Sequence, residues 1–248
     1  MTAVGTIAVG SGTVLGTGAF DVTSSNSNSQ LSIVTGGDDA NLDIVPGSEI
    51  SGVTMGDDVV ENPDSSLDYF DSNGNIVFDK LTIDDLPIAV VNNPGQGMVN
   101  IQVAVAAGTP ASSIDFDDII AIQNNESSQN YEVGFTYSGY GSVVGTVVRG
   151  EEISKNVAHD VFVFETSGGE QISPDGSDGS SAKNLVQVDS GNHQLVNLQV
   201  SADNSTLVGA FGDANNGPYA GAGDFSDSDG NGTHEPLITE VTAGANEV

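Results

Sequence analysis

The chain has 248 residues, and its 35 Asp and Glu against four Lys and Arg give a formal net charge of -31 at pH 7. This balance excludes nucleic acid and disfavours an anionic membrane surface as partners, because no basic stripe is present to neutralise phosphates. The Debye length is about 10 Å at 0.1 M salt and about 3 Å at 1 M, so such a surface indicates a protein adapted to concentrated salt.

Whole-chain disorder is the competing interpretation of so high a net charge. However, 37% of the residues are apolar, and they lie in β-rich runs. We therefore expect a folded protein, with disorder confined to stretches rich in Ser, Asn, Gly and Asp. The chain contains no cysteine, which excludes disulfides and thiolate metal sites and leaves packing and bound cations to stabilise the fold.

The first twenty residues, Met1–Phe20, carry no charge, although 16% of the whole chain is charged. Three interpretations stay open: the end of a secretory signal, a β-strand paired in the fold, and a transmembrane anchor. Glycines at five positions disfavour a spanning helix, and the small residues Gly16–Ala19 resemble a cleavage zone, although a basic start is missing. We expect residues 1–18 to be a signal remnant or apolar N-terminal segment, residues 19–248 to be one domain, and no stable membrane insertion after processing.

Beyond residue 20, short β-branched or alternating apolar runs are separated by Gly, Pro, Asn and Asp, the pattern of strands and turns. We predict strands at Gln30–Val34, Leu42–Val45, Ile76–Ile83, Ile88–Val91, Met98–Ala106, Ile119–Gln123, Tyr131–Tyr137, Val143–Val148, Val161–Thr166, Leu185–Asp189, Gln194–Ser201 and Pro236–Val241. This spacing predicts an all-β fold, an antiparallel jelly-roll-like β-sandwich with long acidic loops. No convincing amphipathic helix is present, the nearest being a turn or two at Ser112–Ile120. Long surface loops are expected at Ser167–Ser181 and Asp213–Thr233.

An acidic segment near the C-terminus has oxygen-bearing side chains at alternate positions. The candidate ligands are Asp227, Asp229, Asn231, Thr233 and Glu235. A chain wraps a hard cation such as Ca²⁺ in this way, although only the first half of an EF-hand loop matches and Ile238 stands where its bidentate glutamate would be. A calcium site and a solvated acidic turn both stay open. The weaker variant Asp71–Asn75 reads as a hairpin turn, because Asn-Gly lies between apolar runs.

The sequence contains no established catalytic motif. No metal-binding histidine pair, nucleophile elbow or phosphate-binding loop is present. The neighbours His159 and Asp160 lack an identifiable nucleophile and are typical of a surface pair. Adjacent carboxylates such as Asp117 and Asp118 point to opposite faces of a strand, so they do not form a glycosidase pair. We therefore expect no enzymatic activity.

Three Asn-x-Ser/Thr sequons are candidate glycosylation sites. Their asparagines are Asn125, Asn204 and Asn231. Some sequons arise by chance in a chain rich in Asn and Ser, but the three fit an exported protein with modified surface loops. The third overlaps the acidic segment, where a glycan and a cation would compete.

Two segments resemble known secreted proteins. The head Gly5–Phe20 is similar to the signal-peptide end of haloarchaeal secreted proteins. The stretch Phe116–Asn125 is similar to the "F-x-D-hydrophobic…N-N" strand-to-turn element of the TasA/camelysin group of biofilm-matrix and bundling-pilus proteins. The resemblance implies a jelly-roll sandwich and an extracellular structural subunit of a halophilic archaeon. Some members of that group polymerise by donating an N-terminal strand to the next subunit.

Strand donation requires an extended apolar segment and an acceptor with an unpaired edge. Phe20 and Val22 alternate at the end of the uncharged head, and the polar stretch Thr23–Gln30 follows as a tether. The sequence thus predicts self-assembly through these two residues into a homopolymer, and an ordinary first strand in its own sheet is the equal alternative. A calcium-dependent cell-surface binding or adhesion module is the second functional hypothesis, based on the acidic segment.

Overall fold

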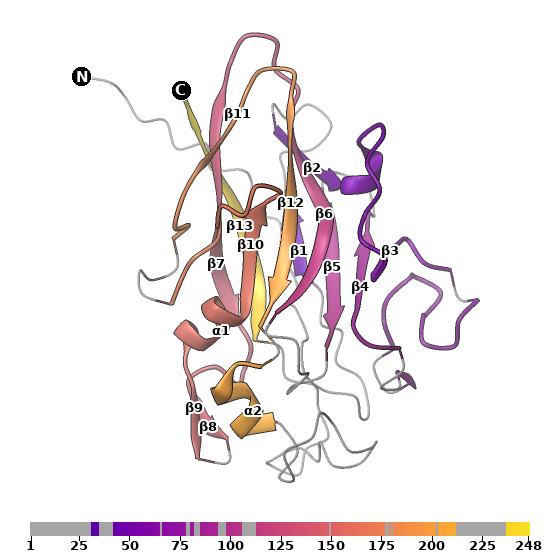
Figure 1. Ribbon diagram of the computed structural model, residues 1–248, viewed down its shortest axis with the longest axis vertical. Coiled ribbons are helices and arrows are strands. Elements are labelled where there is room, and N and C mark those ends of the chain that lie inside the picture. Colours follow the sequence, from indigo (N-terminus) through magenta and orange to yellow (C-terminus); the bar gives the residue numbers. More distant parts are fainter. Residues whose placement is uncertain are drawn as a thin grey trace.

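The structure is a computed structural model, and far more of the residues that it describes lie in strands than in helices (Figure 1). The described residues are 31–34, 42–64, 66–77, 80–81, 85–93, 98–105, 113–148, 150–176, 179, 181–201, 203–211 and 237–248. The prediction of an all-β protein is confirmed.

The larger sheet has seven strands in the order β11-β7-β13-β1-β5-β4-β3. They are β1 (Leu31–Val34), β3 (Val59–Glu61), β4 (Ile88–Asn92), β5 (Met98–Ala104), β7 (Tyr131–Tyr140), β11 (Val186–Val188) and β13 (Ile238–Glu247). Its pairs are antiparallel except β1 with β13 and β3 with β4, which are parallel. The prediction of antiparallel pairing therefore holds for most pairs and is wrong for these two. Parallel neighbours need a long connection, and these two pairs are joined by long stretches of chain.

The smaller sheet has four antiparallel strands in the order β10-β12-β6-β2. They are β2 (Leu42–Pro46), β6 (Ile114–Asn124), β10 (Phe162–Thr166) and β12 (His193–Val200). A separate hairpin consists of β8 (Thr146–Val148) and β9 (Glu151–Ile153). The short strands β3 and β9 were not predicted, whereas β8 and β11, which are equally short, lie within the predicted strands Val143–Val148 and Leu185–Asp189.

Buried residues of both sheets form one hydrophobic core. The ring centroid of Phe135 on β7 lies 5.0 Å from that of Phe164 on β10. The hydroxyl of Tyr137 on β7 donates to the carbonyl oxygen of Phe162 on β10 at 2.6 Å. Both contacts connect one sheet to the other, so the two sheets pack through the faces that carry these rings.

Strand β4 is buried on both faces, which explains its uninterrupted apolar run. Ala89 and Val91 belong to the shared core, whereas Ile88 and Val90 belong to a smaller cluster on the other face. That cluster also contains Phe70, Ile76, Leu81 and Ala104. Residues of the segment that leads from β3 to β4 therefore cover the outer face of the larger sheet at β4 and β5.

The segment Asp71–Asn75 is a turn, as predicted. Its flanking residues Phe70 and Ile76 form an isolated antiparallel bridge, and the Asp71 carboxylate accepts the backbone N–H groups of Asn73 and Asn75, each at 2.8 Å. The prediction of a strand at Ile76–Ile83 is wrong for the described residues, where only this one bridge forms. The backbone N–H of Lys80 donates to the carbonyl oxygen of Val77 at 2.9 Å, so the chain turns again directly after the bridge.

The predicted surface loop Ser167–Ser181 is partly buried. Ile172 and Ser173 have no exposed surface. The backbone N–H of Ile172 donates to the carbonyl oxygen of Phe164 at 2.9 Å, and its carbonyl oxygen accepts from the N–H of Phe135 at 2.7 Å. This segment therefore joins β10 of the smaller sheet to β7 of the larger one. The second predicted loop, Asp213–Thr233, lies outside the described residues.

Two short helices, α1 (Lys155–Val161) and α2 (Ser205–Phe211), were not predicted. The Ser154 hydroxyl caps α1 by accepting the N–H of Val157 at 3.4 Å. At seven residues, each helix is stable only through packing. Both contribute buried residues to the core, and together with the β8–β9 hairpin they cover the lower end of the molecule in Figure 1. The region around Ser112–Ile120 is no helix in its described part, since β6 begins at Ile114.

Candidate functional site

Strand β1 lies in the middle of the seven-stranded sheet, between β5 and β13 (Figure 1). Leu31 pairs with Ile101 and Val34 with Met98 of β5, while Ile33 pairs with Val241 of β13. Among the described strands, β1 alone joins the block β11-β7-β13 to the block β5-β4-β3. The N-terminal strand thus completes a sheet whose remaining strands form two separate blocks.

The two strands that flank β1 carry core residues. Val99, Ile101 and Val103 on β5 and Val241 on β13 are fully buried. Removal of β1 would open the sheet above this core and leave backbone donors and acceptors of β5 and β13 unpaired. We call the position between β5 and β13 the β1 slot. It has the properties of an acceptor for one β-strand.

The predicted self-assembly residues Phe20 and Val22 lie outside the described residues. The nearest described strand, β1, pairs within its own subunit, as in the alternative of an ordinary first strand. A role of Phe20 and Val22 in assembly therefore stays a prediction. The sequence did not reveal the slot itself, because pairing of the first strand with the last depends on the fold.

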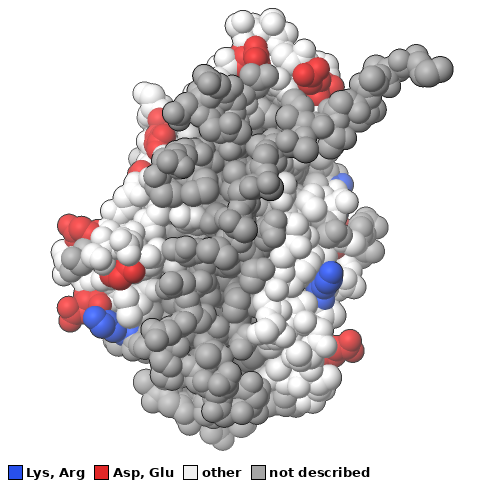
Figure 2. Space-filling model, turned by 180° about the vertical axis from the view of Figure 1, so that it is seen from behind, with Lys and Arg blue, Asp and Glu red and all other residues white. Residues whose placement is uncertain are grey.

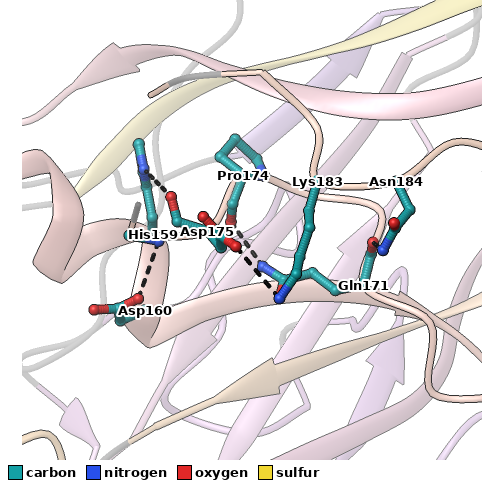
Figure 3. Close-up of polar contacts among 8 residues, drawn as sticks. His159, Asp160, Gln171, Pro174, Asp175, Lys183 and Asn184 are labelled. Atoms are coloured by element: carbon teal, nitrogen blue, oxygen red, sulfur yellow. Dashed lines mark hydrogen bonds and ion pairs between the residues drawn. The ribbon is translucent and has the colours of Figure 1, made fainter. Parts of the chain in front are cut away.

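A second arrangement surrounds His159, which is 1% exposed on α1 (Figure 3). Its Nε2 lies 2.6 Å from the hydroxyl of Tyr140 on β7, and its Nδ1 lies 3.2 Å from the carbonyl oxygen of Asp175. Because a carbonyl oxygen only accepts, Nδ1 carries the proton of the neutral ring and Nε2 accepts from Tyr140. Both nitrogens are satisfied, and the imidazole connects a strand, a helix and a loop.

The prediction of a surface pair between His159 and Asp160 is wrong. Asp160 is exposed, and its Oδ1 accepts the backbone N–H of Gly176 at 3.1 Å. Neighbouring positions on a helix face different directions, so one side chain enters the core and the other reaches solvent. Both nevertheless hold the same loop, one through Asp175 and the other through Gly176.

Further polar contacts fix the same loop (Figure 3). The carboxylate of Asp175 lies 3.3 Å from Nζ of Lys183. Nε2 of Gln171 donates to the carbonyl oxygen of Pro174 at 2.8 Å, and Nδ2 of Asn184 donates to that of Gln171 at 3.0 Å. The contacts join the two ends of the segment 171–184.

The pKa values of His159, Tyr137 and Tyr140 are shifted in the directions that favour their neutral forms. Burial lowers the pKa of His159, and the bond to the Asp175 carbonyl oxygen partly opposes this effect. The ammonium of Lys155, 4.6 Å from the centroid of the Tyr140 ring, also lowers it. Burial raises the pKa of Tyr140 and, more strongly, that of Tyr137. The neutral imidazole is buried among these groups and holds structural elements together.

Two of the three histidines, His159 and His193, lie among the described residues. His193 is exposed at the start of β12, whereas α1 immediately precedes β10, whose first residue Phe162 pairs with Val200 at the end of β12. The two histidines therefore lie at opposite ends of the smaller sheet.

Carboxylates do gather on the outer face of the smaller sheet. The register places Asp115 opposite Gln199 and Glu165 opposite Asn197. Burial, then Asp115 and Asp117, raise the pKa of Glu165. The sequence analysis considered only pairs of adjacent carboxylates. It therefore missed this cluster, whose members come from different strands. In Figure 2, which shows one face of the molecule, acidic residues are spread over the described surface and basic residues occur singly.

Asp118 interrupts the alternation of β6. It has a φ of 50°, and its backbone N–H donates to Oδ1 of Asn197 at 2.8 Å. A register shift in β12 lies opposite, between Val196 and Leu198. Burial, and to a lesser extent Asp117, raise the pKa of Asp118. The bulge turns Asp118 partly inward while Asp117 stays exposed.

The predicted calcium ligands Asp227, Asp229, Asn231, Thr233 and Glu235 all lie outside the described residues. Within the part of the chain that the structure describes, no group of three or more His, Asp or Glu is arranged to hold a metal ion. Of the predicted glycosylation sites, Asn125 is exposed, Asn204 is half-buried, and Asn231 lies outside the described residues.

Comparison with protein-family models and with curated proteins finds no match to this chain. Among the described residues, no helix has both the length and the apolar character needed to cross a membrane.

Proposed function

We propose that this chain is an extracellular structural subunit of a halophilic archaeon that forms filaments, pili or a surface matrix by exchanging its N-terminal strand between subunits. The single observation that carries the proposal is the position of β1 between β5 and β13. The strand completes the sheet of its own subunit, and the same strand from a neighbour would complete it equally well.

The body of the subunit is, in this proposal, a jelly-roll-like β-sandwich. Two sheets that share one core support it, as does the segment around Ile172, which joins β10 to β7 through backbone hydrogen bonds. Such a body would keep both sides of the β1 slot in place when the slot is empty. The resemblance of Gly5–Phe20 and Phe116–Asn125 to secreted matrix and pilus proteins adds to this proposal.

Exchange of β1 replaces contacts within a subunit by identical contacts between subunits. The balance then depends on subunit concentration and on the chain that leads from β1 to β2, residues 35–41. β1 has four residues, whereas β7 and β13 have ten each, so β1 gives up fewer ladder hydrogen bonds when it leaves. At molar salt, screening would allow the acidic subunits to approach one another.

A pair of engineered cysteines tests the exchange, because the natural chain has none. Ser32 and Asn100 are direct partners in the β1–β5 register, at a spacing that suits a disulfide. The double variant Ser32→Cys with Asn100→Cys would be assembled at high salt, oxidised, and separated by denaturing gel electrophoresis without reductant. Exchange predicts a ladder of covalently linked subunits, and electron microscopy of the same sample should show filaments.

Thr136→Cys with Thr242→Cys is the matched control. These residues are partners in the β7–β13 register, which exchange does not touch, so their disulfide should stay within one subunit. A monomer band from the Ser32 and Asn100 pair in assembled material would contradict exchange. Dimers without longer species would contradict a filament, and unreacted thiols would mean that β1 does not lie beside β5.

A further inference from the structure

The connection between β6 and β7 presents Asn125 to solvent on a fixed turn. Residues 125–130 belong to no strand or helix, and both Asn125 and Ser127 are exposed. The preceding Asn124 is buried and fixes the turn. Its Nδ2 donates to the carbonyl oxygens of Gln129 at 2.8 Å and Val188 at 3.0 Å, and its Oδ1 accepts the N–H of Glu126 at 3.0 Å.

The sequon at Asn204 has the opposite setting. Oδ1 of Asn204 accepts the backbone N–H groups of Thr206 at 3.1 Å and Leu207 at 3.3 Å, so it caps α2. The second and third residues of this sequon, Ser205 and Thr206, lie in the first turn of α2. Leu207 is fully buried in the core. An enzyme could bind this sequon in an extended form only after α2 unwinds.

We propose that Asn125 is an N-glycosylation site that is modified in the folded protein, and that Asn204 is not modified. The substrate is an oligosaccharide linked through its C1 to a lipid phosphate. Nδ2 of Asn125 forms a bond to C1, the bond between C1 and the phosphate oxygen breaks, and the lipid phosphate leaves with the electron pair. A base of the transferase takes the amide proton.

The local contacts accommodate the product. Nδ2 of Asn125 donates to Oδ2 of Asp43 at 2.6 Å, and a glycosylated amide keeps one N–H for this bond. The C-terminus lies at the same end of the molecule (Figure 1), since Val248 donates to the carbonyl oxygen of Asn130 at 3.2 Å. A glycan on Asn125 would extend from this end, away from α1 and α2.

This inference rests on the extracellular part of the proposed function, since the transferase acts on exported chains. The test is mass spectrometry of the protein secreted by its native host, after digestion at acidic residues, because four basic residues give too few tryptic peptides. The peptide with Asn125 should carry a glycan mass, and the peptide with Asn204 should not. The variant Ser127→Ala should lose that mass while it keeps Asn125 and its contact with Asp43, whereas Asn204→Gln should leave the mass unchanged.

Modification of both asparagines would overturn the inference, because it would mean that the enzyme acts before α2 forms. A glycan on Asn204 alone, or a secreted chain without a glycan on Asn125, would also overturn it. Neither result bears on strand exchange, which the cysteine pairs test separately.

Discussion

The hydroxyl of Tyr140 lies 2.6 Å from Nε2 of His159 and connects the end of β7 to α1. Because Nδ1 of the same ring bonds to the Asp175 carbonyl oxygen, one imidazole holds three elements together. The contact is partly buried and His159 itself is buried, so loss of the contact should weaken the packing of α1 against β7.

Tyr140→Phe would remove the donor and leave Nε2 of His159 buried without a partner. We expect the free energy of unfolding to fall by about 1–3 kcal/mol, measured by urea denaturation at molar salt. Tyr69→Phe is the control: Tyr69 is half-buried beside Phe70, far from α1, and the change should cost less than about 0.5 kcal/mol. Equal losses in the two variants would argue against the contact.

Stability should fall as the pH drops below the ordinary histidine pKa of about 6.5. Burial lowers the pKa of folded His159, so the unfolded chain takes up the proton first. The contribution of the neutral ring is therefore present above that pKa and is lost progressively as the pH falls towards the lower, folded value. Urea denaturation from pH 8 to pH 5 at constant salt should show a smaller decline in His159→Gln than in the natural chain. A parallel decline in both would exclude His159 as the cause.

Gly47→Ala should destabilise the edge of the smaller sheet. Gly47 begins a 3-10 turn after β2, and a Cβ there would overlap the carbonyl oxygen of Asp118, a backbone atom that cannot rotate away. We expect a loss of about 1–3 kcal/mol or more. At Gly168, the nearest atom to an added Cβ is Oγ1 of Thr166 at 3.5 Å, an ordinary contact. Gly168→Ala should therefore change stability by less than about 1 kcal/mol.

Glu165→Gln should stabilise the protein at pH 7, more in dilute than in molar salt. The pKa of Glu165 is raised by burial and by Asp115 and Asp117, so its charged form is disfavoured in the folded state. Removal of that charge should raise the melting temperature, and salt should reduce the gain by screening the two neighbours. Glu132→Gln, on β7 of the other sheet, serves as the control. The same gain in both variants would point to net charge rather than to this group.

The predicted calcium loop, Asp227–Glu235, has a thermodynamic test. A cation that binds only the folded chain stabilises it by about 2.7 kcal/mol at a hundredfold excess over its Kd. At constant ionic strength, added calcium should raise the melting temperature relative to chelator, and Asp229→Asn should reduce that shift. Asp71→Asn, in the structural turn near β4, should retain it. No shift in the natural chain would contradict the calcium site.

Local patterns predicted much of the strand content. The apolar runs of β4 and of the second part of β6, predicted at Ile119–Gln123, could be recognised because buried strands have few polar residues. The alternating start of β6 at Ile114 was missed. The turn at Asp71–Asn75 was predicted because Asn-Gly between apolar runs acts locally. The helices α1 and α2 were missed, because seven residues hold too few repeats and depend on packing against the core.

The sites depended more on tertiary structure. The sequence pointed to Phe20 and Val22 for assembly, whereas the slot that could accept a strand is formed by β5 and β13, which are far apart in the chain. Reading adjacent residues likewise paired His159 with Asp160, while folding joins His159 to Tyr140. These partners meet because core packing brings distant strands together, which no local pattern records.

By itself, the sequence determined the all-β class, the strong net negative charge and the three sequons. These properties follow from composition and from sequence patterns a few residues long. They do not depend on which distant segments pair in the folded protein. Only the tertiary structure decided that β1 lies between β5 and β13, that His159 is buried, and that Asn125 is exposed while Asn204 caps a helix. Each of these depends on which distant segments share the core, and that choice is made by packing of the whole chain.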